Sequence, residues 1–336
     1  MSTYIIAEAG VNHNGNLATA LELCDAAKDC GVDAIKFQTW KTEKIVGKNT
    51  ATADYQSRNT GDETQSQFEM LKKLELSQAD FRTIQEHCDK IGIDFLSTPD
   101  EEESLDFLVN GLRLPLIKVG SGEITNVHYL RQIGECRLPV ILSTGMATLA
   151  QVAVAYDVLA EAGAPEITLL HCTTNYPCPM DEVNLRAMTT LHDAFKCKVG
   201  YSDHTLGIEI PVAAVALGAE VVEKHFTLDR NMPGPDHKAS LETAELRQMV
   251  REIRNVEQAL GDGIKRPNRS EVEIAKVVRK SIIAKRPIKK GEKFSEDNLT
   301  IKRVGKGLSA SFWDLVLGLY ADADYEEDEP VRIQTI

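Results

Sequence analysis

The sequence predicts an α/β protein in which a closed (β/α)8 barrel precedes a small β-rich domain. Short apolar segments recur eight times, and each is followed by a polar loop and then by apolar residues at helical spacing. Parallel strands need such helical connections, and eight of them close most economically into a TIM barrel. After about residue 262 this alternation stops, and short apolar segments are separated by proline and glycine turns.

A doubly wound open sheet is the alternative architecture. Such sheets usually contain fewer strands, and the dinucleotide-binding version carries GxGxxG after its first strand. That pattern is absent after the first predicted strand. We therefore prefer the barrel.

The predicted elements follow one another in regular alternation along the first 260 residues. The strands are Ile5–Glu8, Ala34–Gln38, Phe95–Thr98, Ile117–Val119, Val140–Ser143, Thr168–His171, Val199–Ser202 and Val221–Lys224. The clearest helices, by their apolar spacing of three and four residues, are Leu17–Cys30, Gln78–Ile91, Leu149–Ala162 and Thr243–Leu260.

Two segments interrupt this alternation. The loop from Lys41 to Leu76, with the polar stretch Asn59–Gln65, is too long for an ordinary βα connection, so we expect a lid or a substrate loop. The stretch from Gly261 to Arg269 is rich in glycine and charged residues and is typical of a linker. We predict a barrel domain over residues 1–262, a linker over 263–278 and a C-terminal domain over 279–336.

Composition excludes several classes of protein. The net charge of −13 argues against nucleic acid as a partner, because phosphates bind to basic surfaces. No apolar stretch approaches the roughly 20 residues of a membrane helix, and the N-terminus lacks the basic segment of a signal peptide. Seven cysteines without a CxxC pair fit reduced thiols. We expect a cytoplasmic protein that binds neither nucleic acid nor membranes.

Polar residues stand at all eight predicted strand ends, where a barrel carries its catalytic groups. A single lysine such as Lys36 or Lys118 is as often a structural ion-pair partner as a ligand-binding group. Burying so many polar groups without a function would cost kilocalories for each unpaired group. Two lysines among serines and threonines therefore predict a site for a polar, anionic substrate.

His204 and His225 are candidate metal ligands because they end consecutive predicted strands. Neighbouring strands lie about 4.8 Å apart, so two imidazoles can share one ion at roughly 2.1 Å each. Two protein ligands leave positions for water and a substrate oxygen, which suits Lewis-acid catalysis. A pair of hydrogen-bonded core histidines is the alternative that spacing alone leaves open.

A series of segments, in order along the chain, carries a resemblance to a known family. They are IIAEAGVNHNG, IKFQT, LSTP, KVGSGEI, ILSTGM, LLHCTTNYP, GYSDHT, EKHFTLD and GPDHKAS. Together they resemble the sialic acid synthase family, and the tail RKSIIAKRPIKKGEKFSEDNL with IKRVGKG is similar to that family's antifreeze-like (SAF) domain. The match runs nearly from end to end.

The resemblance implies a condensation of phosphoenolpyruvate with an N-acetylated aminosugar and water, releasing phosphate. The expected acceptor is N-acetylmannosamine, which gives N-acetylneuraminate. The alternative is 2,4-diacetamido-2,4,6-trideoxymannose, which gives N,N'-diacetyllegionaminate. C3 of phosphoenolpyruvate attacks the sugar aldehyde, water adds at C2, and the C–O bond to phosphate breaks.

The resemblance also implies roles for residues at the matching positions. Phosphoenolpyruvate is expected to contact Lys36, Thr98, Lys118, Ser121, Thr174 and Ser202. The sugar is expected to contact Gln38, Tyr176, Asp236 and Arg303. The implied catalytic residues are Glu8, Glu123, His204 and His225. The two histidines hold Mn²⁺, with Mg²⁺ or Co²⁺ as alternatives, while either Glu8 or Glu123 positions or activates the water.

The family resemblance further implies a domain-swapped homodimer, in which the C-terminal domain of one subunit caps the partner's active site. This chain departs from the family pattern at Asp100, where an aromatic residue is common, and at Val304 and Lys306, where proline and asparagine are frequent. Thr174 lies at a variable position. These departures leave the acceptor sugar open but not the reaction.

Two other functions compete with this one. A metal-dependent aldolase would use free pyruvate instead of phosphoenolpyruvate. A carbohydrate- or ice-binding protein is suggested by the antifreeze-like tail alone, and the polar strand ends argue against it.

Overall fold

The computed structural model describes residues 2–48, 50 and 66–333. The chain divides into two compact units, Met1–Gly261 and Asp262–Ile336. Each unit has its own hydrophobic core.

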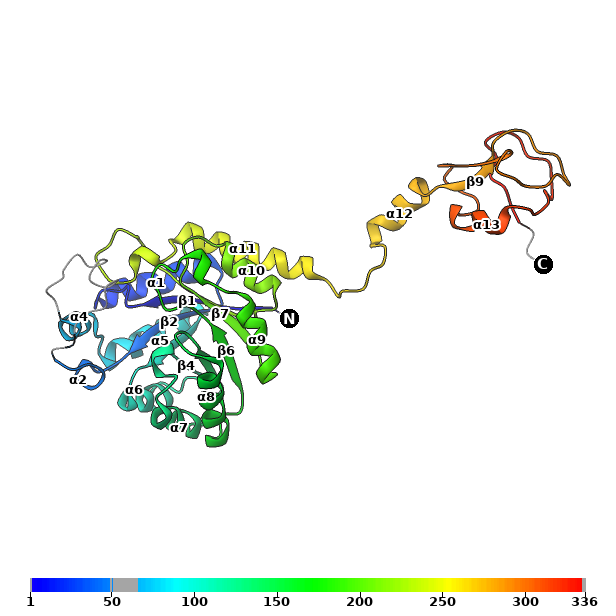
Figure 1. Ribbon diagram of the computed structural model, residues 1–336. Helices are drawn as coiled ribbons and strands as arrows, with labels where there is room; N and C mark the ends of the chain where they lie inside the picture. Colours follow the sequence, from blue (N-terminus) through cyan, green and yellow to red (C-terminus); the bar gives the residue numbers. More distant parts are fainter. Residues whose placement is uncertain (1, 49, 51–65, 334–336) are drawn as a thin grey trace. The chain divides into compact units, whose positions relative to one another are not determined.

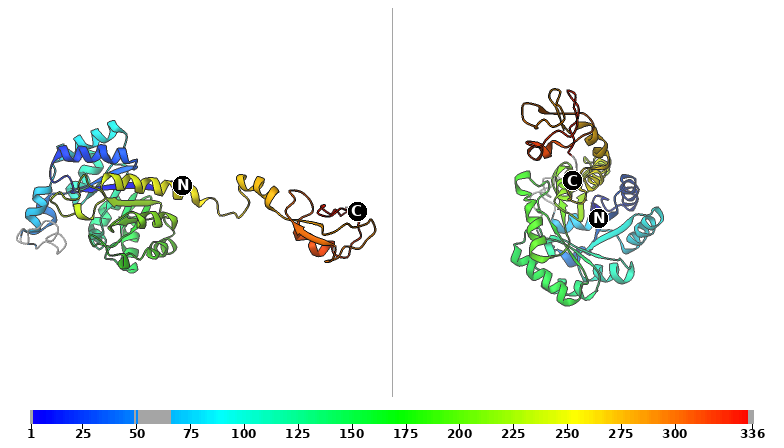
Figure 2. Two further views of the ribbon diagram at one scale, coloured as in Figure 1. Left: turned by 90° about the horizontal axis from the view of Figure 1, so that it is seen from above. Right: turned by 90° about the vertical axis from the view of Figure 1, so that its right-hand side faces the viewer.

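The first unit is a barrel of parallel strands with helices around the outside (Figures 1 and 2). Its strands are β1 (Tyr4–Gly10), β2 (Ala34–Thr39), β3 (Asp94–Pro99), β4 (Ile117–Val119), β5 (Val140–Ser143), β6 (Ile167–His171), β7 (Val199–Asp203) and β8 (Val221–His225). Backbone pairing joins them in the order β3-β2-β1-β8-β7-β6-β5-β4, and β3 and β4 at the two ends of this ladder contact each other. The predicted barrel is confirmed, and each predicted strand matches within about two residues at either end.

Several of the helices that cover the barrel begin or end at residues that cap them. They are α1 (Leu17–Cys30), α5 (Gln78–Ile91), α6 (Glu102–Asp106), α7 (Val127–Glu135), α8 (Leu149–Ala162), α9 (Arg186–Phe195), α10 (Glu209–Ala216) and α11 (Thr243–Leu260). At α5, for example, Ser77 and Asp80 exchange side-chain hydrogen bonds with each other's backbone N–H, and Gly92 at φ 73° ends the helix. The four clearest predicted helices have the observed bounds.

Strand alternation decides what faces the barrel axis. On β1, Ile6 lies in a small apolar cluster inside the barrel, whereas Ile5 and Ala7 pack in the main core. Side chains two residues apart share a face, so Glu8 follows Ile6 toward the axis. The interior therefore has an apolar lower layer and a polar layer above it, at the C-terminal ends of the strands.

A fully buried ion pair lies between β7 and β8. The Lys224 ammonium contacts the Asp203 carboxylate, and both side chains have an exposed fraction of 0%. Thr205 donates its backbone N–H and its hydroxyl to the same carboxylate. The pair joins the ends of the strands that carry the predicted histidines.

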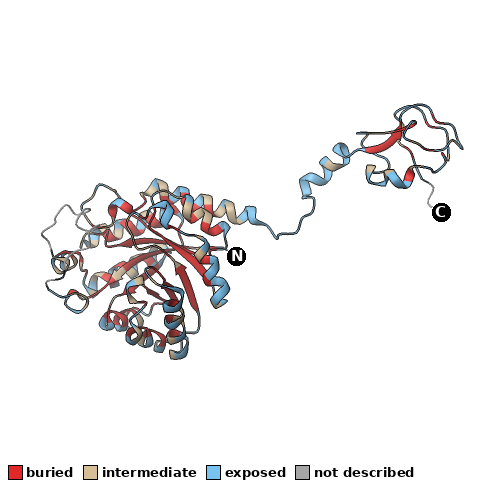
Figure 3. Ribbon diagram, in the orientation of Figure 1, coloured by how far each residue is buried: buried red, intermediate tan, exposed pale blue. Residues whose placement is uncertain are grey.

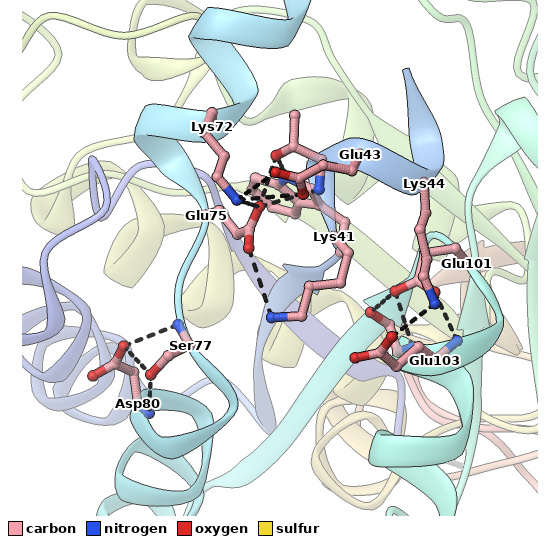
Figure 4. Close-up of polar contacts among 12 residues, drawn as sticks. Lys41, Glu43, Lys44, Lys72, Glu75, Ser77, Asp80, Glu101 and Glu103 are labelled. Atoms are coloured by element: carbon pink, nitrogen blue, oxygen red, sulfur yellow. Dashed lines mark hydrogen bonds and ion pairs between the residues drawn. The ribbon is translucent and has the colours of Figure 1, made fainter. Parts of the chain in front are cut away.

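In its described part, the long loop after β2 contains two helices that the sequence did not predict, α2 (Thr42–Ile45) and α4 (Gln67–Leu74). Glu75 ties them together, because it accepts from Thr42 and pairs with Lys41 and Lys72 (Figure 4). The polar stretch Asn59–Gln65, on which the prediction of a lid rests, lies outside the described residues.

The second unit is small and rich in turns. Strands β9 (Ser281–Ala284) and β10 (Leu299–Lys302) pair antiparallel, and a short helix α13 (Trp313–Val316) packs with them around a compact apolar cluster. Part of the segment predicted as a linker forms the helix α12 (Arg269–Val278), which Figure 3 shows as almost wholly exposed. A capping box between Asn268 and Glu271 starts this helix.

Within the described residues, no helix combines the length and apolarity needed to cross a membrane. All seven cysteines are free thiols.

Candidate active site

A polar hollow of about 160 Å³ lies at the C-terminal ends of the barrel strands. Most residues singled out from the sequence line it, and they come from seven different strands or the loops after them. They are Glu8, Lys36, Gln38, Thr98, Lys118, Ser121, Thr174, Tyr176, Ser202, His204 and His225.

Strand register brings these side chains together. Glu8 lies beside Lys36 on β2 and beside His225 on β8. Gln38 lies beside Thr98 on β3. Each of these residues is two positions beyond an inward-facing neighbour, so the alternation of the strands points them all into the same hollow.

The charges in the hollow form one connected network. The Lys36 ammonium lies 2.6 Å from one Glu8 carboxylate oxygen and 3.8 Å from Glu223. The Lys118 ammonium lies 3.6 Å from the other carboxylate oxygen of Glu223. All four side chains are at most 7% exposed, so the network is held together in a nearly water-free environment, where charge interactions are strong.

Hydroxyl groups complete the surroundings of the two lysines. Lys36 donates to Thr98 at 3.2 Å, and Lys118 donates to Ser143 at 2.8 Å. Ser121 accepts from the backbone N–H of Gly145 at 2.9 Å. The Thr174 hydroxyl is buried and has no hydrogen-bond partner, which leaves it available to a ligand.

The network shifts the pKa values of its two carboxyl groups, Glu8 and Glu223, in opposite directions. Burial raises the pKa of Glu8 to about 7, even though Lys36 pulls it the other way. Burial would also raise the pKa of Glu223, but Lys118 and Lys36 lower it below its usual value. Burial lowers the pKa of Lys118, whereas Glu223 and Glu8 overcome burial and raise the pKa of Lys36. The hollow thus combines an ionised carboxylate with one that can exchange a proton near neutral pH.

His204 and His225 face each other, with ring centroids 5.4 Å apart. His204 Nδ1 lies 2.6 Å from the Thr173 carbonyl oxygen, so it carries the proton and leaves Nε2 as a lone pair. His225 Nδ1 is buried without a hydrogen-bond partner. Burial lowers the pKa of both rings, which favours the neutral form that binds metals. The Tyr176 ring packs against the pair, and its centroid lies 4.1 Å from the centroid of the His204 ring.

Three predicted site residues lie elsewhere. Glu123 lines a separate, wider hollow beside the first one. Asp236 stands in the loop after β8, partly buried, with a pKa raised to about 6 by burial. Arg303 follows β10 in the second unit and is exposed.

Besides two glycines, four residues that line the hollow were not assigned a role from the sequence: Asp100, Ser143, Cys172 and Glu223. Glu223 could have been found by alternation, because it lies two positions before His225 on the same strand and therefore shares its face. Cys172 contacts Ser121 at 3.2 Å between sulfur and oxygen. Cys172 comes one residue after β6, where the alternation of a strand no longer predicts which way a side chain points.

Fold and hollow together define a class: a (β/α)8-barrel protein whose strand ends hold two buried lysines, paired with carboxylates, beside a pair of buried histidines. Within that class the chain belongs to the NeuB family, whose model matches residues 23–265, and it continues with a SAF domain over residues 279–336. The resemblance found in the sequence is confirmed.

Relatives with assigned names match almost the whole chain. The N,N'-diacetyllegionaminic acid synthase of Campylobacter jejuni is 52% identical over 98% of this chain and 99% of its own length. The protein of the same name from Legionella pneumophila is 47% identical, over 95% and 90% respectively. Among solved structures, the N-acetylneuraminic acid synthetase of Leptospira borgpetersenii, in complex with citrate, matches with a TM-score of 0.73 and 34% identity, covering 82% of this chain and 90% of that one.

Proposed function

We propose that this protein is a nonulosonic acid synthase that condenses phosphoenolpyruvate with an N-acetylated aminosugar and water and releases phosphate. The observation that carries the proposal is the pair of buried lysines, Lys36 and Lys118, in the hollow at the mouth of a NeuB-family barrel. A small, densely charged anion is the ligand that such lysines and their hydroxyl neighbours fit.

For the acceptor we propose 2,4-diacetamido-2,4,6-trideoxymannose, which would give N,N'-diacetyllegionaminate. The resemblance seen in the sequence implied N-acetylmannosamine as the expected acceptor and this sugar as the alternative. The two relatives that are about half identical to this chain are both named for the legionaminate reaction, and they support the second acceptor better than the first.

Phosphoenolpyruvate would bind with its phosphate and carboxylate between Lys36 and Lys118. Thr98, Ser121, Thr174 and Ser202 would donate hydroxyl hydrogen bonds to its oxygens. Lys36 and Lys118 are already held by Glu8 and Glu223, so their ammonium groups need little reordering when the anion arrives. Such preorganisation lowers the cost of binding and of charge development.

His204 and His225 would hold a divalent metal, for which we propose Mn²⁺, with Mg²⁺ or Co²⁺ as alternatives. Two neutral rings with free nitrogen lone pairs fit a metal ion, and the buried, unpartnered His225 Nδ1 supports this. Within the described residues, no group of three or more metal-binding side chains surrounds a common point, so substrate and water would supply the remaining ligands. When bound, the ion would orient and polarise the sugar aldehyde.

Glu8 and Glu123, the two candidates for positioning the water, differ in their surroundings. Glu8 lies inside the hollow, where Gln38 donates to one of its oxygens at 3.2 Å. Glu123 lies on the wall of the neighbouring hollow, where it accepts from Asn126. We propose that Glu8 positions the water that adds to C2, and that Glu123 contributes only to the acceptor side.

The sugar would lie over the histidine pair, against Tyr176 and Gln38, with Asp236 near its hydroxyls. Arg303 would bind the N-acetyl group from the C-terminal domain of a partner subunit. The chain would then act as a domain-swapped homodimer in the cytoplasm.

The decisive experiment offers both acceptors in competition with phosphoenolpyruvate in the presence of Mn²⁺, and identifies products by mass spectrometry. We expect N,N'-diacetyllegionaminate to predominate. In ¹⁸O-water, released phosphate should carry no label, because the C–O bond and not the P–O bond breaks. Product from pyruvate without phosphate release would instead support the aldolase, and the absence of product with every donor and acceptor would refute the proposal.

A further inference from the structure

Asp100, directly after β3, lies on the wall of two hollows at once. One is the small hollow that contains both buried lysines. The other, of about 660 Å³, is lined also by Glu101, Glu102 and Glu123. The Asp100 side chain therefore separates the two spaces and contributes to the wall of each.

The proposed phosphoenolpyruvate site uses both lysines and four hydroxyl side chains of the small hollow. The other polar side chains of its wall, Asp100 among them, are therefore left for the acceptor. An acceptor that extends beyond its aldehyde toward the wider hollow passes the Asp100 side chain.

The wall of the wider hollow is acidic, and most of its charges are fixed. Lys44 is the lysine on this wall, and its ammonium is held by Glu103 at 2.7 Å (Figure 4). Glu101 caps the N-terminus of α6 through the backbone N–H of Ser104. Among the described residues, the Asp100 carboxylate has no hydrogen-bond or ion-pair partner.

We propose that Asp100 is a specificity-determining residue that restricts the acceptor to uncharged sugars. Its carboxylate accepts hydrogen bonds from hydroxyl or amide N–H groups of a neutral sugar, and it repels a sugar that carries phosphate or carboxylate. This inference rests on the proposed condensation, since it assigns a role within that reaction.

The ionisation of Asp100 decides at which pH this repulsion acts. Burial, followed by the negative charge of Glu123, raises the pKa of Asp100 to about 7, despite Lys36 and Lys118. The carboxyl group is therefore only partly ionised near neutral pH and almost fully ionised at about pH 8.5. Discrimination against a phosphorylated acceptor should therefore be measured at about pH 8.5, where Asp100 carries its negative charge.

The test compares one sugar with and without a phosphate group. The wild type, Asp100→Asn and Glu102→Gln are each assayed with N-acetylmannosamine and with its 6-phosphate, and the ratio of kcat/KM for the two acceptors is measured. Where turnover is too slow, both compounds are tested as competitive inhibitors of the diacetamido-sugar reaction, and the ratio of their inhibition constants is used instead.

We expect Asp100→Asn to raise the relative use of the phosphorylated acceptor at least tenfold. Glu102→Gln removes the same charge from the same wall, but this side chain is 65% exposed and solvent screens it, so we expect less than a threefold change. The wild-type ratio should also rise with ionic strength, and more steeply than that of Asp100→Asn.

Three results would overturn the assignment. An unchanged ratio in a folded Asp100→Asn protein that still uses the neutral sugar would do so, as would equal effects of both substitutions. A loss of phosphorylated-acceptor use in Arg186→Met, without an effect of Asp100→Asn, would place the acceptor in the hollow of about 420 Å³ beyond Cys172. Absence of phosphate release by the wild type with any acceptor would instead refute the proposed function itself.

Discussion

Ion pairs are numerous in both units, but they lie in opposite environments. In the barrel, Lys36 and Glu8 are 2.6 Å apart with side chains 2% exposed. In the C-terminal unit, Lys302 and Asp328 are also 2.6 Å apart, yet both side chains are about half exposed. Equal geometry therefore does not mean equal energetic weight. When one partner of a buried pair is removed, the other charge stays buried without a counter-charge or water. At the surface, water solvates the remaining charge.

The comparison teaches where this protein concentrates electrostatic energy. The barrel mouth holds charges that would be costly if they had no partner, and a ligand can use them. The surface of the C-terminal unit is charged for solubility and local order. Four predictions would break or sharpen this contrast.

The largest expected effect is on turnover when a lysine of the hollow is removed. Lys118→Met should lower kcat/KM for phosphoenolpyruvate by about 10²–10³, as loss of a preorganised charge-stabilising donor does. Phosphate release measures the loss, with Lys302→Met as the matched lysine control. Equal activity of Lys118→Met and wild type would mean that this buried lysine only supports the fold.

The second effect is on stability. Lys36→Met should lower the free energy of unfolding by about 3 kcal/mol, because Glu8 is left buried without its main counter-charge. The double variant with Glu8→Gln should recover part of this loss. Urea unfolding followed by circular dichroism measures both. If the double variant is no more stable than the single one, the two charges are not coupled as the geometry implies.

The third effect depends on pH and comes from the barrel, since all eight histidines precede residue 262. Burial lowers the pKa of His237 from 6.5 to about 4, so between these values the unfolded chain binds a proton that the folded chain does not. Stability must therefore fall as pH decreases from about 6.5 toward 4. Between pH 7 and 5, His237 should account for about 2 kcal/mol of that fall.

This pH effect is measured as unfolding free energy at both pH values for the wild type, His237→Asn and the exposed control His192→Asn. The wild type and His192→Asn should lose the same amount between pH 7 and 5, and His237→Asn should lose less. His13, whose pKa burial also lowers to about 4, accounts for part of what remains. An identical pH dependence in all three proteins would contradict the buried-histidine explanation.

The smallest effect is expected at the surface of the C-terminal unit. Lys302→Met breaks the ion pair with Asp328, and both groups regain water. We expect the unfolding midpoint to stay within the error of measurement. A shift as large as that of Lys36→Met would remove the contrast between the two regions.

Much of the barrel could be predicted from the sequence because its signals are local. Apolar periodicity and caps such as Ser77 and Thr148 mark elements within a few residues of their ends. The hollow followed from the rule that barrels carry polar groups at the C-terminal ends of their strands. Alternation along β8 would also have assigned Glu223.

Other features depend on packing that no local pattern encodes. Helices α2 and α4 are short pieces joined through Glu75, and α12 begins after a glycine- and proline-rich stretch that masked its capping box. The separation of Glu123 from the small hollow depends on the turn after β4. Neither spacing nor residue type could have distinguished it from Glu8.

The buried pair of Lys224 and Asp203 has a consequence for how the chain finds its fold. Val222 and Tyr201 lie two positions before these residues, share their outward faces and pack in the main core. A one-residue slip of β8 against β7 would turn Val222 and Lys224 together toward the barrel axis and leave Asp203 without a counter-charge in the core. The pair thus penalises misaligned closure, and it fixes His204 and His225 opposite each other before any ligand is present.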